Sequence, residues 1–249
     1  MSSDLINALI AAGTSIAVVV LSQFLIHIKD RSQLRKKELD AVLKEYFNPI
    51  RFMLSENYFR ISQIVDKVKR EGSAKKLLTV NHSSEISGKD DEWFSGEGCY
   101  LVSSGYLLAC MFSYIDNIRT KLSFFRLPHN TDTELIRLIN KLTAEFSTAG
   151  IYYVIQMDIG KKIYNAETGV LSYREFCMLF KNEQDLVWYS SIIDFFLALG
   201  RGGYQKAEYI LKDIEELTHY IDYAVSGGGS IEQKMRAEQE VSDKISYLG

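Results

Sequence analysis

The chain has 249 residues, of which 47% are apolar, 24% charged and 12% aromatic. This composition excludes a disordered, collagen-like or polytopic membrane protein and is typical of one compact domain with an additional segment. Only two prolines occur. Together with long stretches of 3.6-residue periodicity, this scarcity predicts an all-α fold.

The net charge of −3 hides an uneven distribution along the chain. Residues 29–76 carry 13 Lys and Arg against 7 Asp and Glu, whereas residues 77–249 carry 16 against 24. The total charge gives no reason to expect a nucleic-acid partner. Cys99, Cys110 and Cys177 form no C-x-x-C pair, so neither a disulfide framework nor a zinc site is predicted.

The N-terminal region is the most informative part of the sequence, because residues 5–28 contain no formal charge. As a helix, these 24 residues would extend about 36 Å, enough to cross a hydrocarbon core of about 30 Å. They therefore predict a transmembrane anchor over residues 1–28. A buried helix of a soluble domain is the alternative.

A basic cluster follows the apolar run, and no Lys or Arg precedes it. The cluster consists of Lys29, Arg31, Arg35, Lys36 and Lys37. By the positive-inside rule, this asymmetry predicts a single-pass inner-membrane protein with its N-terminus outside and its C-terminal domain in the reducing cytosol. The cluster would face the anionic lipid of the inner leaflet. Within the span, Gly13 and Ala17 form a small-x-x-x-small step that favours self-association of the helices.

Residues 29–76 read as basic juxtamembrane amphipathic helices, with one apolar stripe from about 33 to 70. Asn48-Pro49 interrupts the stripe. The chain either kinks there or reverses, and a reversal would bring Lys67 to Lys76 toward the same leaflet. Residues 71–97 are rich in Gly, Ser, Asp and Lys, which predicts a long connecting loop with at most one short extended piece.

Residues 77–226 are predicted to form a cytosolic helical bundle. Seventeen uncharged residues, from 99 to 115, favour a central buried helix over a second membrane span. Further helices are expected over 131–149, over 151–164 with an interruption at Gly160, after the capping box Ser172–Glu175, over 183–199 and over 204–225. Residues 227–249 read as a flexible charged tail.

Motifs for catalysis are absent from the sequence, which contains no P-loop, no G-x-S-x-G elbow and no H-E-x-x-H. No catalytic residue, metal ligand or cofactor is therefore predicted. The acidic residues Asp90, Asp91, Glu92 and Glu97 lack the spacing of a calcium loop and are expected to be solvated. Asp194 lies inside the apolar run from Ile192 to Phe196. It is either a buried, paired carboxylate at a ligand site or a helix edge that reaches solvent.

These observations predict a non-enzymatic interaction or sensor module that recruits or responds to a protein partner at the inner membrane face. The alternative is a membrane-disrupting effector whose cytosolic domain senses a signal and drives oligomerisation of the span. Its one-span layout is similar to that of some effector subunits of bacterial anti-phage systems. An enzyme with a non-standard site around Asp194 or residues 81–97 is a third option, and an aromatic-lined pocket for a nucleotide or small signal is a fourth.

Overall fold

The structure is a computed structural model, and it describes residues 29, 30, 33, 34, 37, 41, 43–121, 131–165 and 169–225. The chain divides into one unit that ends at Glu45 and a second that begins at Tyr46. The second unit contains α2 and all later elements, and these are helices apart from one short hairpin. The all-α prediction is thus confirmed for the described residues.

A π-helical turn, η1 (Leu43–Phe47), precedes the bundle. The longer helices are α2 (Asn48–Glu71), α5 (Cys99–Lys121), α6 (Thr131–Thr148), α7 (Tyr153–Ile163), α8 (Tyr173–Lys181), α9 (Glu183–Gly200) and α10 (Gln205–Val225). Three short elements, α3 (Lys75–Leu78), the 3-10 helix η2 (Ser83–Glu85) and α4 (Asp91–Ser95), connect α2 to α5. β1 (Tyr164–Asn165) and β2 (Gly169–Val170) pair antiparallel, with Tyr164 opposite Val170.

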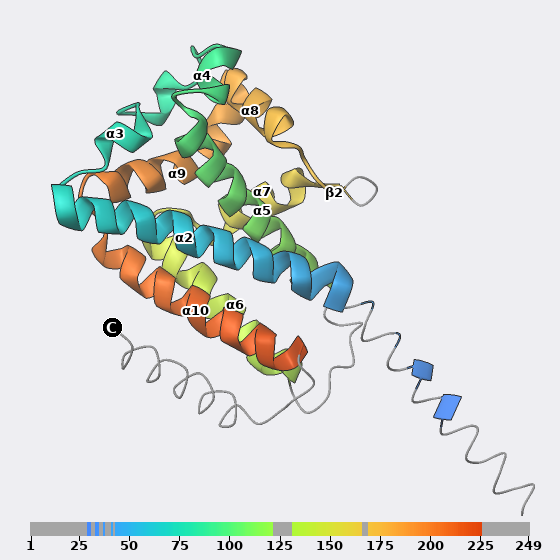
Figure 1. Cartoon of the computed structure of the whole chain (residues 1–249). Coiled ribbons are helices and arrows are strands. Elements are labelled where there is room, and N and C mark those ends of the chain that lie inside the picture. Colours follow the sequence, from blue (N-terminus) through green and yellow to red (C-terminus); the bar gives the residue numbers. More distant parts are fainter. Residues whose placement is uncertain are drawn as a thin grey trace, which may run out of the picture. The chain divides into compact units, whose positions relative to one another are not determined.

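The central element is α5, which contacts α2, α7, α8 and α9 (Figure 1). More than half of its residues are buried, from Leu101 to Ile118, because its sequence is apolar around the whole circumference. The prediction of a central buried helix is therefore confirmed. Among the described residues, no helix combines the length and apolarity needed to cross a bilayer. The predicted span over residues 5–28 lies outside the described residues.

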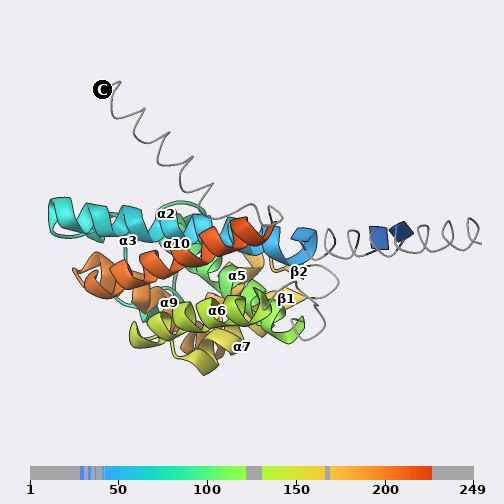
Figure 2. The same cartoon turned by 90° about the horizontal axis from the view of Figure 1, so that it is seen from below.

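The backbone does not reverse at Asn48-Pro49. Phe47 is already helical, with φ −77° and ψ −41°, and Pro49 lies in the first turn of α2, where its missing N–H leaves no hydrogen bond unmade. The apolar stripe of α2 packs against α5 and α10, and α10 also packs against α6 (Figure 2). Helix α2 is therefore part of the compact unit that begins at Tyr46.

The structure of residues 71–97 differs from the prediction of a long connecting loop. They form α3, η2 and α4, and their apolar side chains are buried: Leu78, Val80, Ile86, Trp93 and Phe94. Asp90 caps α4 by accepting a hydrogen bond from the backbone N–H of Trp93 at 2.8 Å. Glu85 accepts hydrogen bonds from the N–H groups of Asn81 and His82 at 3.1 and 3.0 Å. Local capping and scattered apolar residues thus order a segment whose composition resembles a loop.

Helix α7 passes through Gly160 without the predicted interruption. A Cβ atom at Gly160 would lie 2.8 Å from the carbonyl oxygen of Phe112 in α5. The glycine therefore permits the close approach of two helix backbones instead of ending a helix. The predicted bounds of α6, α9 and α10 agree with the structure to within one residue at each end. The capping box before α8 is confirmed, because Ser172 Oγ accepts from the N–H of Glu175.

Candidate functional site: a groove between α7 and α9

An open groove of about 490 Å³ lies between α7 and α9. Asp158, Lys161 and Lys162 of α7 and Trp188 and Tyr189 of α9 line it, and we call it the α7–α9 groove. The three α7 residues share one side of the helix because they are three and four positions apart. The groove thus combines aromatic surface with charges of both signs.

The two aromatic residues of the groove differ sharply in burial. Trp188 is 52% exposed, whereas the next residue, Tyr189, is only 2% exposed. The Tyr189 ring packs edge-on against Phe176 and Phe180 of α8, with centroid distances of 6.4 and 6.2 Å. Tyr189 therefore fixes the position of this part of α9, and Trp188 is presented on a rigid support.

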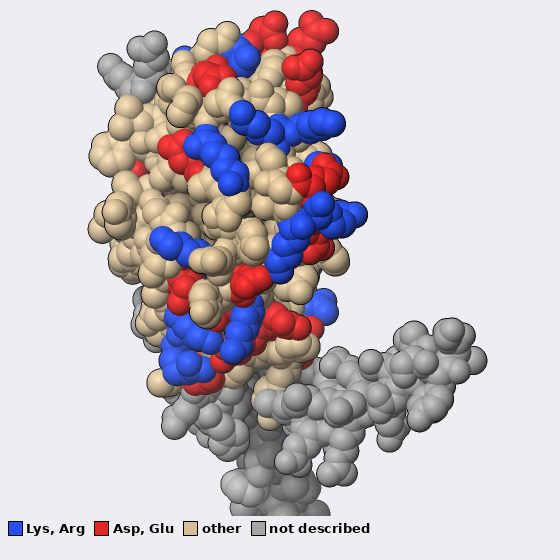
Figure 3. All heavy atoms as spheres, turned by 90° about the vertical axis from the view of Figure 1, so that its left-hand side faces the viewer, with Lys and Arg blue, Asp and Glu red and all other residues tan. Residues whose placement is uncertain are grey.

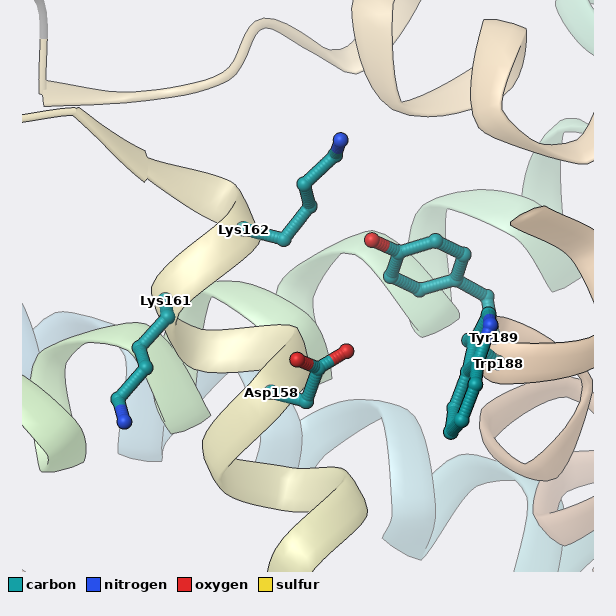
Figure 4. A pocket seen from close by; sticks show the side chains of 5 residues that line it. All are labelled: Asp158, Lys161, Lys162, Trp188 and Tyr189. Carbon is teal, nitrogen blue, oxygen red and sulfur yellow. The ribbon is translucent and has the colours of Figure 1, made fainter.

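Figure 4 shows how the charged side chains are arranged around the groove. The carboxylate of Asp158 points toward Trp188, whose indole ring is seen edge-on with one face turned to the side of Asp158. Lys162 extends beside the hydroxyl end of Tyr189, and Lys161 points away from both aromatic rings. The Asp158 side chain, which is exposed, forms no ion pair or hydrogen bond with any residue that the structure describes.

The charge of Lys161 acts on a different carboxylate. Burial raises the pKa of Asp116 in α5, and the positive charges of Lys161 and Arg119 oppose this rise. Arg119 donates hydrogen bonds to Asn140 Oδ1 and Thr143 Oγ1 at 2.8 and 2.9 Å. Because Lys161 points away from the aromatic rings, Asp158 and Lys162 are the charged groups that face them.

Asp194 is exposed, so the sequence-based option of a buried paired carboxylate at this position is wrong. Val187, Ser190 and Ala198, seven and four positions away on the same helix face, are not buried either. Consecutive residues of a helix point about 100° apart, so the apolar residues on either side of Asp194 do not surround its side chain. The carboxylate reaches solvent at a helix edge, which was the other option.

Among the residues whose burial the structure describes, the buried carboxylate is that of Asp213 in α10, whose side chain is 4% exposed. Its Oδ1 forms an ion pair with Lys141 Nζ of α6 at 2.9 Å, and Lys141 also pairs with Glu216 at 2.6 Å. Arg137 forms ion pairs with Glu134 and Glu216, and these pairs extend the network along α6 and α10. This network holds two helices together and lies outside the groove residues.

The buried thiols are not activated as nucleophiles. Burial raises the pKa of Cys110 to about 12 and also raises that of Cys177. Two tyrosines nearby are held by backbone acceptors: Tyr106 donates to Leu171 O at 2.6 Å and Tyr173 to Phe94 O at 2.9 Å. Because the thiolate is the reactive form, these cysteines act as core residues at neutral pH.

Two of the four acidic residues of the 90–97 segment have structural roles, and the other two, Glu92 and Glu97, are exposed. Asp90 caps α4, and Asp91 forms an ion pair with Lys181 of α8 that lowers the pKa of Asp91. In the part of the chain that the structure describes, no three His, Cys, Asp or Glu side chains are grouped to hold a metal ion.

The charged face at the end of α2 is mixed, not uniformly basic. Figure 3 views this side of the molecule, and Lys and Arg side chains are interspersed there with Asp and Glu. Lys69 pairs with Glu208 of α10 at 2.7 Å, and Lys67 pairs with Glu71 at 2.9 Å. These ion pairs are typical of an ordinary solvated helix end.

The residues of the predicted membrane region are largely outside the described part of the chain. Lys29 and Lys37 of the basic cluster are described, and both are exposed. Arg31, Arg35 and Lys36 lie outside the described residues, as do Gly13 and Ala17 of the predicted span. The tail at 227–249 is outside them too.

The five groove residues do not stand out in the sequence, because α7 and α9 are separated by the hairpin and by α8. The one available signal is Trp188, one of two tryptophans in the chain. No known protein family, curated protein or solved structure matches the chain.

Proposed function

We propose that the chain is a membrane-anchored helical module that binds a protein partner in the α7–α9 groove. The observation that carries this proposal is the half-exposed Trp188 at the edge of an open groove. Tryptophan is among the residues that contribute most binding energy at protein interfaces, where its large ring fills a partner's surface. Val187, the preceding residue of α9, is 72% exposed and leaves a second apolar side chain accessible next to the groove residues in the sequence.

The groove is suited to binding because its walls are already ordered. Tyr189 is packed into the aromatic cluster of α8, and Gly160 seats α7 closely on α5. A preorganised site pays little conformational entropy on association, so more of the contact energy appears as affinity. Such a groove accepts a side chain or a short segment of another protein.

The membrane part of the proposal comes from the sequence. Residues 5–28 have the length and apolarity of a membrane span, and the basic cluster between Lys29 and Lys37 follows this span on its C-terminal side. We place the N-terminus outside the inner membrane and the helical domain in the cytosol. A tethered binding domain raises the local concentration of its partner at the inner face without any additional contact.

Site-specific photo-crosslinking of the full-length chain in cells tests the binding function. A photoreactive amino acid replaces Val187 beside the groove, and in a matched control it replaces Glu215, an exposed residue of α10. We expect one adduct of defined mass at position 187 and no such adduct at position 215. Equal labelling at both positions, or none at either, would refute a partner site in the groove.

Alkaline carbonate extraction tests the anchor independently. We expect the full-length chain to stay in the membrane pellet, and a Val19→Lys variant to be released because a charge at the middle of a span costs about 3 kcal/mol. Recovery of the unmodified chain in the supernatant would contradict the anchor. If expression depolarises cells and Gly13→Leu abolishes that effect, the membrane-disrupting effector replaces the recruiting module.

A further inference from the structure

Two unpaired groups face each other across the α7–α9 groove. Asp158 directs its carboxylate toward the indole of Trp188, and the carboxylate has no charged partner among the residues that the structure describes (Figure 4). A carboxylate on one side and the face of an aromatic ring on the other are both attractive to a cation. The space between them lies within the groove, which is open to solvent.

We propose that this space receives the guanidinium group of an arginine side chain from the protein partner. The proposal rests on the partner-binding function given above and specifies the chemistry that the partner must carry. The guanidinium would stack on the indole of Trp188 and donate hydrogen bonds to the carboxylate of Asp158.

Arginine fits this arrangement better than lysine does. Its guanidinium is planar, it donates two parallel hydrogen bonds to a carboxylate, and it is more weakly hydrated than an ammonium group. A planar cation satisfies Asp158 with its edge while its face lies on Trp188, whereas an ammonium group has no flat face to stack.

The two lysines of the groove do not occupy this space. Lys161 points away from the aromatic rings, and its charge acts on Asp116 (Figure 4). Lys162 extends from α7 beside the hydroxyl end of Tyr189 and away from the carboxylate of Asp158. Lys162 therefore favours a partner segment in which an acidic residue lies near the arginine.

The test uses the full-length chain in detergent micelles and the peptide acetyl-Gly-Arg-Gly-amide. Binding is followed by tryptophan fluorescence, since Trp188 is 52% exposed whereas the other tryptophan, Trp93, is 9% exposed. The same peptide with citrulline tests the charge, because citrulline has nearly the shape of arginine but is neutral. A peptide with Glu tests for anion binding, and free arginine amide tests whether a small cation alone suffices.

We expect the Arg peptide to change the fluorescence in a saturable manner and the citrulline peptide to bind at least five times more weakly. Asp158→Asn is expected to weaken the binding of the Arg peptide by about five- to tenfold, because the ion pair between the guanidinium and the carboxylate is lost. Asp194→Asn is the matched control, an exposed aspartate elsewhere on the same bundle, and should leave the affinity unchanged.

Equal binding of the Arg and citrulline peptides, no effect of Asp158→Asn, or preferential binding of the Glu peptide would each overturn the arginine assignment. Stronger binding of free arginine amide than of the peptide would point to a small-molecule ligand and would also overturn a protein partner's side chain as the occupant. These outcomes are separate from the crosslinking result. An adduct at position 187 without Arg-peptide binding would leave the partner function standing and remove only this occupant.

Discussion

Replacing Lys141 by methionine removes the cation that compensates a buried carboxylate. Asp213 is 4% exposed, its Oδ1 lies 2.9 Å from Lys141 Nζ, and its Oδ2 is buried without a hydrogen-bond partner among the described residues. Removing one member of a fully buried ion pair costs about 3–5 kcal/mol. Because the Lys141 side chain is 38% exposed, water reaches the site and we expect a smaller loss of about 2 kcal/mol.

Urea unfolding of the full-length chain in detergent, followed by tryptophan fluorescence, measures this loss. With a denaturant dependence of about 2 kcal/mol per molar urea, the midpoint should fall by about 1 M. The control is Lys212→Met, an exposed lysine of α10 beside Asp213 in the sequence, for which no shift is expected. The double variant Lys141→Met/Asp213→Asn should recover about 1 kcal/mol relative to Lys141→Met, because the uncompensated charge is gone.

Equal midpoints for Lys141→Met and Lys212→Met would refute the view that Asp213 depends on its partner. An additive double variant would likewise show that the two residues do not interact. In that case the network between α6 and α10 would be an ordinary set of surface charges.

Three further predictions concern helix packing, acid pH and alkaline pH. Gly160→Ala should lower the free energy of unfolding by about 1–2 kcal/mol, since its Cβ would meet the Phe112 carbonyl at 2.8 Å. The control Gly88→Ala should leave the free energy of unfolding unchanged, because the space around Gly88 is open. Equal urea midpoints for the two variants would contradict the close approach of α7 and α5. Lys141 lowers the pKa of Glu216 below its ordinary value of 4.5, so the contribution of the Glu216 carboxylate to stability is present above pH 4.5 and is lost as the pH falls through the lowered pKa. Urea midpoints measured from pH 5 to pH 3 should therefore fall less steeply in Glu216→Gln than in the unchanged chain. Burial raises the pKa of Cys110 from 9.0 to about 12, so the contribution of the protonated thiol to stability is complete below pH 9 and is lost as the pH rises toward 12. The thermal unfolding temperature should therefore fall less steeply between pH 9 and pH 12 in Cys110→Ala than in the unchanged chain. Equal slopes in the two proteins would count against a thiol that stays protonated.

The helices could be predicted from the sequence, but the environment of individual polar groups could not. The bounds of α6, α9 and α10 followed from apolar periodicity and from Gly150 and Gly200 at their ends. Asp194 was weighed as a buried carboxylate because its sequence neighbours are apolar, yet it is exposed. Asp213 lies between Lys212 and Glu215 in a polar stretch, yet it is buried.

The α7–α9 groove depends on tertiary structure for the same reason. Asp158 and Trp188 are 30 positions apart on different helices, and only the packing of α7 on α5 and of α9 on α8 brings them to one groove. No spacing rule within a single helix links them. In the sequence, Trp188 was the one residue of the groove whose type indicated a binding surface.

The sequence by itself determined the helical character of the chain, most helix limits, and the uncharged stretch and basic cluster from which we predict an anchor. Tertiary structure decided that Gly160 continues a helix, that residues 71–97 are ordered, and that Asp213, not Asp194, is buried. Periodicity and capping act within about one to five turns of a chain, so they can be read locally. The burial of a side chain and the partners of a charge depend on which distant helix covers that position, and packing alone specifies this.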